Sequence, residues 1–266
     1  MIKSDLCIVV PLGVSSPNTP IKKYLLDCIN SLKNQKTKFS YDVIFACDDN
    51  VSDEIKEILL NSGFKIRWFE PYYFMRKGGI WKKIHTVWQS ENSKYISFCH
   101  YDDMWSENKV ESQIQFMIDN NLEMCWSKVQ VINENNQICS NDICNLEVFN
   151  SRTIHSSSYA FCHSSIMQKD LFLSSGILDY VDIGSALYER LQFIFSHKLN
   201  GKKDNNSCFF HRVHTDSVTN NFNSEKSYMT EQRKEANYSL QEVLEDANKI
   251  PLDKIIKSIL NENNLS

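Results

Sequence analysis

The sequence has little that would attach the protein to a membrane or a nucleic acid. It contains no stretch of about 18 apolar residues, the length needed to span a bilayer. The opening "MIKSDLCIVVPLG" holds only a strand-length apolar run and does not resemble a secretory signal. The formal net charge of -4 gives no basic surface for anionic lipid or nucleic acid. We expect a cytoplasmic protein with no nucleic-acid partner and at most a peripheral membrane association.

Two common kinds of site are also missing. The nine cysteines are odd in number, lie mostly in apolar runs and include no Cys-x-x-Cys pair. This pattern favours reduced core residues over a disulfide framework or a zinc site. The chain also lacks Gly-x-Gly-x-x-Gly and Gly-x-x-x-x-Gly-Lys-Ser/Thr, the glycine-rich loops whose backbone binds phosphates. A bound diphosphate would therefore need a metal ion in place of such a loop.

The first third of the chain alternates strand-like and helix-like patterns four times. The 266 residues, 42% of them hydrophobic, are enough for a full core. Apolar stripes at helical spacing follow each strand-like run, and Asn50 or Ser52 is a plausible N-cap of the second helix. This alternation predicts βαβ units and a mostly parallel sheet covered by helices. The four predicted strands are residues 7–12, 42–48, 64–70 and 94–100.

The rhythm loosens after about residue 120, and the sequence predicts three regions. Residues 1–120 form the alternating first half, 121–224 a less regular second half, and 225–266 a pair of amphipathic helices separated at Pro251. Mixed charges on the tail helices favour packing on the domain or a homodimer contact over membrane attachment. Within the second half we expect strands at 123–133 and 157–168, a last strand and loop at 206–219, and helices at 169–175 and 185–197.

Two pairs of adjacent aspartates follow predicted strands. Asp48 and Asp49 end the second strand, and Asp102 and Asp103 follow the fourth. Ligands of parallel sheets bind outside the carboxyl ends of the strands, so we expect all four carboxylates at one edge. A divalent cation between carboxylates and a polyphosphate makes such a like-charge pair tolerable, and oxygen ligands suit Mg²⁺ or Mn²⁺. The alternative is that either pair merely favours the start of the next helix.

These segments resemble a known family. "CIVVPL", "CINSLKNQ", "DVIFACDDNVSDE" and "YISFCHYDDMWSENKVESQIQFM" are similar, in order and spacing, to family-2 glycosyltransferases of the GT-A fold. The resemblance covers residues 6–120 well and continues weakly to about 219. It implies a Rossmann-like, mostly parallel α/β nucleotide-binding sheet with a C-terminal acceptor-side region, to which this sequence adds a helical tail. It also implies an inverting transfer of a sugar from a nucleotide diphosphate to an acceptor hydroxyl. On this resemblance, residues 1–120 would be the nucleotide-sugar-binding half and 121–224 the acceptor-binding half.

Carried over residue by residue, the resemblance places Pro11 at the end of the first strand in the donor site. Asp48 and Asp49 would meet the nucleoside, and Asp49 is the better fit to the motif. Asp102 would bind Mn²⁺ or Mg²⁺ with Asp103 as its support. His100 stands where the family has the first acid of Asp-x-Asp, so one ribose or metal contact differs from the family pattern.

Basic side chains and histidines could contact the diphosphate or its metal ion. Lys83, in the basic stretch "RKGGIWKK", could contact it, although a solvated helix start is the more common outcome. The resemblance makes His214 a candidate ligand of the metal or diphosphate and Arg212 a candidate phosphate partner. Because "HRVH" is expected on a strand, where side chains alternate, at most one of His211 and His214 should face the site.

The general base is expected from residues 182–189. Ser185 occupies the position where the family has its base, so we consider Asp182 first and Glu189 second as the carboxylate that takes the acceptor's proton. The predicted function is transfer from a UDP-sugar to a glycan or lipid-linked glycan in surface glycan biosynthesis. Two alternatives stay open: a catalytically silent nucleotide-sugar-binding partner, and a nucleotidyltransferase.

Overall fold

The computed structural model describes residues 4–13, 21–70, 79–140, 142–143, 162–174 and 199–214. Within these ranges no helix is both long enough and apolar enough to cross a membrane. The strands are β1 (Ser4–Leu12), β2 (Tyr41–Asp48), β3 (Lys65–Phe69), β4 (Ser93–Phe98), β5 (Met104–Trp105), β6 (Met124–Ile132), β7 (Ser165–Gln168) and β8 (Gly201–Arg212). The helices are α1 (Ile21–Lys33), α2 (Asp53–Asn61), α3 (Gly79–Ser90), α4 (Lys109–Asp119) and α6 (Lys169–Ser174).

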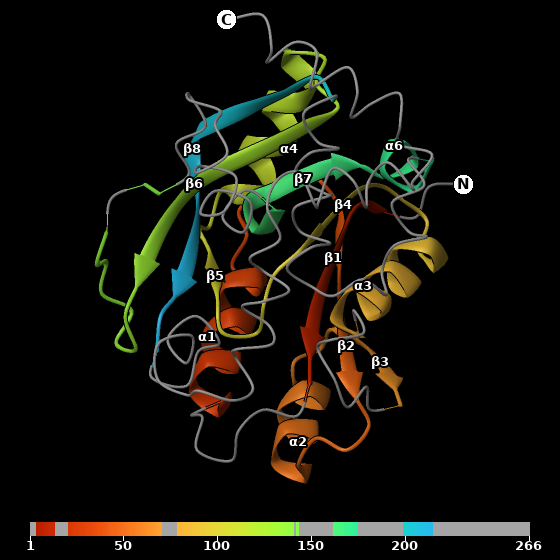
Figure 1. Ribbon diagram of the computed structural model, residues 1–266, viewed down its shortest axis with the longest axis vertical. Helices are drawn as coiled ribbons and strands as arrows, with labels where there is room; N and C mark the ends of the chain where they lie inside the picture. The colour runs from red at the N-terminus through yellow and green to blue at the C-terminus, as the bar shows by residue number, and fades with distance from the viewer. Residues whose placement is uncertain are drawn as a thin grey trace, which may run out of the picture.

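The strands form one sheet in the order β3-β2-β1-β4-β7-β6-β8-β5. The first four strands are mutually parallel, as predicted, and Figure 1 shows β1, β2 and β3 ending at the same edge. Strand β7 is antiparallel to both β4 and β6, while β8 is parallel to β6. The sheet therefore continues across the predicted boundary at residue 120, and strands from both predicted halves belong to it.

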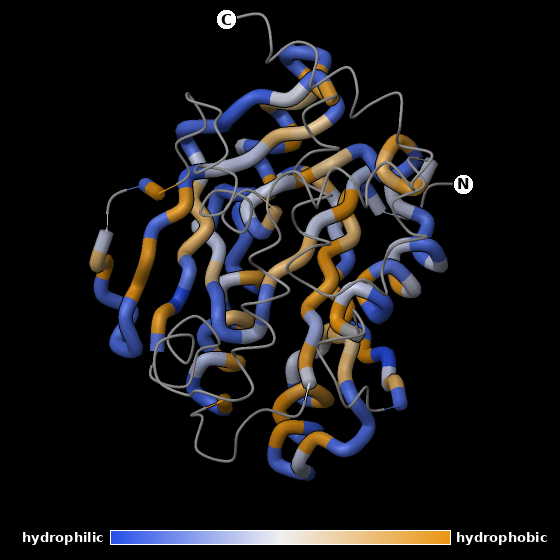
Figure 2. The backbone as a smooth tube through the Cα atoms, in the orientation of Figure 1, coloured by the Kyte–Doolittle hydropathy of each residue, from blue (hydrophilic) through white to orange (hydrophobic). Residues whose placement is uncertain are grey.

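Strand β1 lies at the centre of the first half. It pairs with β2 on one side and β4 on the other, and every residue from 6 to 12 is buried. A strand covered on both faces reads as a continuous apolar run, and Figure 2 shows β1 as largely hydrophobic. Pro11 fits because the Val9 carbonyl, two residues earlier, accepts from Cys99 at the end of β4. The nitrogen of Pro11 faces the same side of β1 as the Val9 carbonyl, the side on which β4 lies. The last residue of β1 paired with β4 is Val9, so the N–H that Pro11 lacks would have had no partner in that strand.

The bounds of most described helices and strands agree with those predicted from the sequence, and two predicted strands differ. Ser52 caps α2, and its hydroxyl accepts from the Ile55 amide at 3.4 Å. Of the strand predicted over 157–168, the described part begins at residue 162, and there Ser165–Gln168 form β7 while residues 162–164 are helical. The last strand starts earlier than predicted, at Gly201. The predicted helix at 185–197 and the tail at 225–266 lie outside the described residues.

The cysteines behave as the composition predicted. Six of the eight described cysteines are buried as free thiols in the core, and the others are partly or fully exposed. Burial raises the pKa of the Cys7 and Cys47 thiols to about 12. These two side chains are therefore protonated packing groups at neutral pH.

Candidate active site

The two acidic pairs lie at the carboxyl edge of the sheet. Leu12 of β1 is in register with Cys47 of β2, and Val9 is in register with Phe98 of β4. Asp48 is the last residue of β2, and Asp102 follows β4 by four residues. A Cβ added to Gly13 would lie 3.0 Å from Asp48 Oδ2, so the Asp48 carboxylate reaches over the end of β1. Both acidic pairs therefore follow the carboxyl ends of parallel strands, as the strand pattern predicted.

Lys83 of α3 is neither solvated nor at the surface of this edge. Its ammonium group forms an ion pair with Asp48 Oδ1, and the two side chains are only 3% and 6% exposed. The predicted phosphate contact of Lys83 does not match this position, because the ammonium group already pairs with Asp48. Asp49, in contrast, is exposed, and its amide donates to the Phe69 carbonyl at 2.9 Å.

Asp103 is fully buried and held by β8. Its Oδ1 accepts from the backbone N–H of Arg212 at 2.8 Å and lies 3.1 Å from Nδ1 of His211. Burial raises the pKa of Asp103, and the neighbouring Asp102 charge adds to this, against the opposing effect of His211. Burial lowers the pKa of His211, but the Asp103 carboxylate outweighs it and the net pKa is raised. The Asp103 carboxylate therefore favours the protonated form of the His211 ring.

Asp102 is more accessible than Asp103. Its side chain is 20% exposed, and Oδ2 lies 3.2 Å from Nε2 of His214. Burial raises the pKa of Asp102, but the hydrogen bond with His214 and the neighbouring imidazoles bring it below its ordinary value. Asp102 is thus a carboxylate at neutral pH.

Both histidines of "HRVH" reach the acidic pair, which corrects the sequence prediction. His211 contacts Asp103 and His214 contacts Asp102. The alternation of side chains applies only inside a strand, and β8 ends at Arg212. The Val213 amide still donates to the Ile132 carbonyl at 2.9 Å, but His214 lies outside β8. Strand alternation therefore does not fix the side of His214, and both histidines contact the acidic pair.

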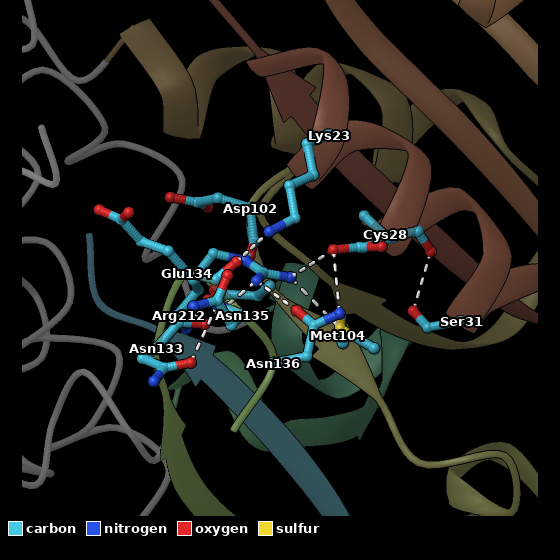
Figure 3. Close-up of polar contacts among 12 residues, drawn as sticks. Lys23, Cys28, Ser31, Asp102, Met104, Asn133, Glu134, Asn135, Asn136 and Arg212 are labelled. Atoms are coloured by element: carbon cyan, nitrogen blue, oxygen red, sulfur yellow. Dashed lines mark hydrogen bonds and ion pairs between the residues drawn. The ribbon is translucent and has the colours of Figure 1, made fainter. Parts of the chain in front are cut away.

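Arg212 lies beneath the site and not on its rim. The side chain is fully buried, and its guanidinium donates to protein acceptors that include the Asp102 carbonyl and Asp27 of α1 (Figure 3). The phosphate contact implied by the resemblance requires an exposed guanidinium. The structure therefore places Arg212 elsewhere than that prediction does.

Three residues near the site carried no recognisable signal in the sequence. The ring of Tyr24 lies 4.9 Å from the His214 ring, and the buried His163 ring lies 4.5 Å from His100. Burial lowers the pKa of His163 well below its ordinary value, which makes it a neutral ring under the site. Tyr24 and Asp27 belong to an ordinary amphipathic helix, and His163 follows a cysteine in a predicted strand. Only long-range contacts reveal them.

The side chains that could act as metal ligands partly fit the predicted divalent cation. Among the described residues no group of three or more His, Cys, Asp or Glu side chains could hold a metal ion. Asp102 and His214 lie side by side and offer one carboxylate oxygen and one imidazole nitrogen. Asp103 does not fit as a direct ligand, because it is fully buried and its Oδ1 already binds β8. Mg²⁺ and Mn²⁺ often take only one or two protein ligands and complete their shell with phosphates and water.

The predicted general bases, Asp182 and Glu189, lie outside the described residues. His100 is partly exposed next to the acidic pair, and Pro11 is buried in β1. At this edge Asp102 contacts His214, with His100 close enough to influence the Asp102 carboxylate, and Asp48 and Asp49 lie at the end of β2.

Residues 13–172 match the family described as glycosyl transferase family 2, which covers more than half of the chain. A curated relative from Escherichia coli, "UDP-Glc:alpha-D-GlcNAc-diphosphoundecaprenol beta-1,3-glucosyltransferase WfgD", is 30% identical over 93 residues. That match spans 35% of this chain and 36% of the relative, so it covers about a third of the relative's length.

Solved structures of TarS from S. aureus share the fold. The structure of TarS 1-349 in complex with UDP aligns with a TM-score of 0.54 and 14% identity, over 94% of this chain and 73% of that one. Its complex with UDP-GlcNAc aligns with a TM-score of 0.56 and 13% identity, over 93% and 75% of the two chains. The predicted GT-A fold is confirmed by this likeness and the family match together. By its sequence from residue 13 to residue 172, this chain belongs to glycosyl transferase family 2.

Proposed function

We propose that the protein is an inverting glycosyltransferase of the cytoplasm that moves a sugar from a UDP-sugar to a hydroxyl of a glycan or lipid-linked glycan during surface glycan biosynthesis. The observation that carries the proposal is the adjacency of Asp102 and His214 at the sheet edge that also presents Asp49. The TarS complexes with UDP and UDP-GlcNAc support a uridine donor. The name of the E. coli relative, which includes a diphosphoundecaprenol-linked sugar, supports a lipid-linked acceptor.

The nucleoside end of the donor belongs to Asp48 and Asp49. The exposed Asp49 carboxylate at the tip of β2 can accept from the ring N–H of uracil or from the ribose hydroxyls, as acidic residues do at this edge of related sheets. The buried Asp48 pairs with Lys83 and reaches over the end of β1 at Gly13. This ion pair supports the nucleoside site from below and keeps the end of β2 in place.

The diphosphate end of the donor belongs to Asp102 and His214. These two side chains would hold Mg²⁺ or Mn²⁺, which supplies Lewis-acid stabilisation to the negative charge of a leaving diphosphate. His214 packs against the Tyr24 ring on one side and contacts Asp102 on the other, so its orientation is set before ligand binds. Asp103 does not reach the donor; it ties the acidic loop to β8 through Arg212 and His211.

Inversion at the anomeric carbon needs a carboxylate on the opposite face of the sugar to take the acceptor's proton. We retain Asp182 as the first candidate and Glu189 as the second, from the resemblance of residues 174–191 to the family. Substituting each by alanine and measuring transfer with saturating donor would identify the base. Loss of turnover with unchanged UDP affinity would be expected only for the true base.

The test of the proposal is nucleotide binding with and without metal. We expect UDP to raise the melting temperature of the wild-type protein more strongly with Mn²⁺ than without it. Asp102→Ala should abolish that metal dependence and sugar transfer, whereas the control Asp119→Ala, at the exposed end of α4, should keep both. Retention of the Mn²⁺ dependence by Asp102→Ala would contradict the proposed ligand.

Hydrolysis of UDP-sugars separates an enzyme from a silent binding partner. We expect slow release of sugar from a UDP-sugar in the absence of acceptor, and faster consumption with a lipid-linked acceptor. Metal-dependent UDP binding without any consumption of UDP-glucose or UDP-GlcNAc would favour the silent partner. The third hypothesis, a nucleotidyltransferase, is not supported by the family to which the chain belongs.

A further inference from the structure

The guanidinium of Arg212 is saturated by protein acceptors. The group is fully buried, and an arginine side chain has five N–H donors. Figure 3 shows it at the centre of a polar cluster. Nε donates to the Asp102 carbonyl at 2.7 Å, Nη1 to the Asn133 carbonyl at 3.3 Å and to Asn136 Oδ1, and Nη2 to Asp27 Oδ2 at 3.1 Å and Met104 Sδ at 3.3 Å. Five donors thus meet five acceptors, and none remains for a ligand.

Arg212 makes one hydrogen bond to Asp102 and one to Asp103. Its side chain donates to the main-chain carbonyl of Asp102, and its own backbone N–H donates to the carboxylate of Asp103 at 2.8 Å. Arg212 is the last residue of β8 and is in register with Ile132 of β6. Both hydrogen bonds are therefore made by a residue whose backbone is fixed in the sheet. The position of the Asp102 carboxylate follows from the main chain that carries it.

The far side of the guanidinium is anchored to two other elements. Asp27 of α1 binds Arg212 and also accepts from Asn136 Nδ2 at 3.2 Å. The turn at residues 133–136 is tied to α1 again by Lys23, which donates to the Glu134 carbonyl. The Asn136 backbone has φ 63°, a left-handed conformation that asparagine tolerates better than most residues. The cluster therefore joins α1, β8, this turn and the acidic loop around one guanidinium.

The same cluster also reaches His214. The Arg212 guanidinium lies 4.6 Å from the centre of the Tyr24 ring, and the same ring packs against the His214 ring at 4.9 Å. Arg212 therefore influences both side chains that would hold the metal, Asp102 through its carbonyl and His214 through Tyr24. Neither path requires contact with the donor.

We propose that Arg212 is a positioning residue that aligns Asp102 and His214 for the metal–diphosphate end of the donor, and that Asp27 is the anchor that keeps Arg212 in place. The inference rests on the proposed function and deepens it. Partners that orient metal ligands without touching the metal change metal affinity or activity by about 10- to 100-fold when they are substituted.

The experiment uses a variant remote from the donor, because Arg212 variants alone would not separate contact from positioning. The affinity of UDP is measured by titration calorimetry with and without saturating Mn²⁺ for the wild type, Asp27→Ala, Arg212→Lys and the control Asp119→Ala. We expect Asp27→Ala to lower the Mn²⁺-dependent gain in UDP affinity by about tenfold. We also expect it to leave the affinity without metal within about twofold of the wild type.

Arg212→Lys tests whether charge alone is enough. Lysine keeps the positive charge but offers a compact ammonium group that cannot serve five acceptors in one plane. We expect it to lose the Mn²⁺-dependent gain at least as strongly as Asp27→Ala. Melting temperatures of all variants are recorded, so that titrations are made well below each transition. A variant that fails to fold is replaced by Asn136→Ala, which removes a single acceptor of the guanidinium.

Three outcomes would overturn the proposal. If Arg212→Lys weakens UDP equally with and without Mn²⁺ while Asp27→Ala behaves as the wild type, Arg212 contacts the diphosphate itself. If Asp27→Ala lowers only the melting temperature, its role is structural. If the wild-type protein shows no Mn²⁺-dependent gain in UDP affinity, the proposed function fails first, and the positioning role fails with it.

Discussion

At the scale of single residues, the buried pair of Lys83 and Asp48 is the most costly feature of the site. Removing two charges from water is unfavourable, and their attraction compensates only when the geometry is good. Such a pair adds little to stability compared with apolar residues of the same volume. Its position at the tip of β2, below Asp49, is where a nucleoside has to be oriented. We infer that the pair is retained for alignment.

Lys83→Met tests this pair. The substitution leaves a buried carboxylate without its counter-charge, so we expect the free energy of unfolding to fall by roughly 3 kcal/mol. The measurement is urea denaturation at neutral pH. Lys56→Met, which removes an exposed ion pair with Asp53, is the matched control and should change stability by less than about 1 kcal/mol. Equal effects of the two substitutions would show that Asp48 is not dependent on Lys83.

At the scale of elements, helix α4 begins with a buried lysine. Lys109 is fully buried, and its ammonium group donates to the Gln113 side chain and to the Ser164 carbonyl at 2.6 Å. It also lies 4.7 Å from the centre of the Trp105 ring. Burial lowers the pKa of Lys109 to about 8, against the opposing effect of distant carboxylates and thiols. A positive charge at a helix N-terminus is also unfavourable to the helix dipole.

The pH dependence of stability follows from this shift. Between the folded pKa of about 8 and the unfolded value near 10.5, the unfolded chain binds a proton that the folded chain has released, so stability rises with pH. Lys109→Met lacks this effect. We expect the free energy of unfolding of the wild type, relative to Lys109→Met, to increase by roughly 2 kcal/mol from about pH 8 to about pH 10. A constant difference across this range would contradict a neutral lysine in the folded state.

At the scale of the whole molecule, the sheet joins the two predicted halves without a break. Strand β4 pairs with β1 on one side and β7 on the other, and β7 pairs with β6. The seam is also bridged inside the core, where the Gln113 amide donates to the carbonyls of Cys125 at 3.0 Å and Ser164 at 3.1 Å. Contacts of this kind couple the stability of the two parts.

We therefore expect a single unfolding transition for the sheet. Tryptophans lie on both sides of the seam, at positions 81 and 88 in α3 and 126 in β6. Urea curves from fluorescence and from far-UV circular dichroism should coincide. Gly201→Ala should shift both curves together by roughly 1 to 3 kcal/mol, because the added Cβ would lie 2.5 Å from Met124 Cγ in the neighbouring strand. Two separated transitions would show that the halves unfold independently.

Much of the fold was predictable because its signals are local. Strands β1 to β4 and the helices between them appear as apolar runs and stripes whose periods differ, and Ser52 was one of two predicted caps of α2. The strand prediction over residues 162–164 was wrong, because these residues, which lie between the apolar Phe161 and Ile166 in the sequence, form a helical turn. Apolar content alone does not separate these two states over a few residues.

The sequence by itself determined the alternating architecture and the edge at which both acidic pairs lie, because both depend on patterns within a dozen residues and on the parallel pairing those patterns impose. Only the tertiary structure decided which side chains face one another there. Lys83 pairs with Asp48, both His211 and His214 reach the acids, and Arg212 is buried instead of exposed. Such contacts join residues up to 185 positions apart, and their geometry depends on where strands end and on which helix packs over them.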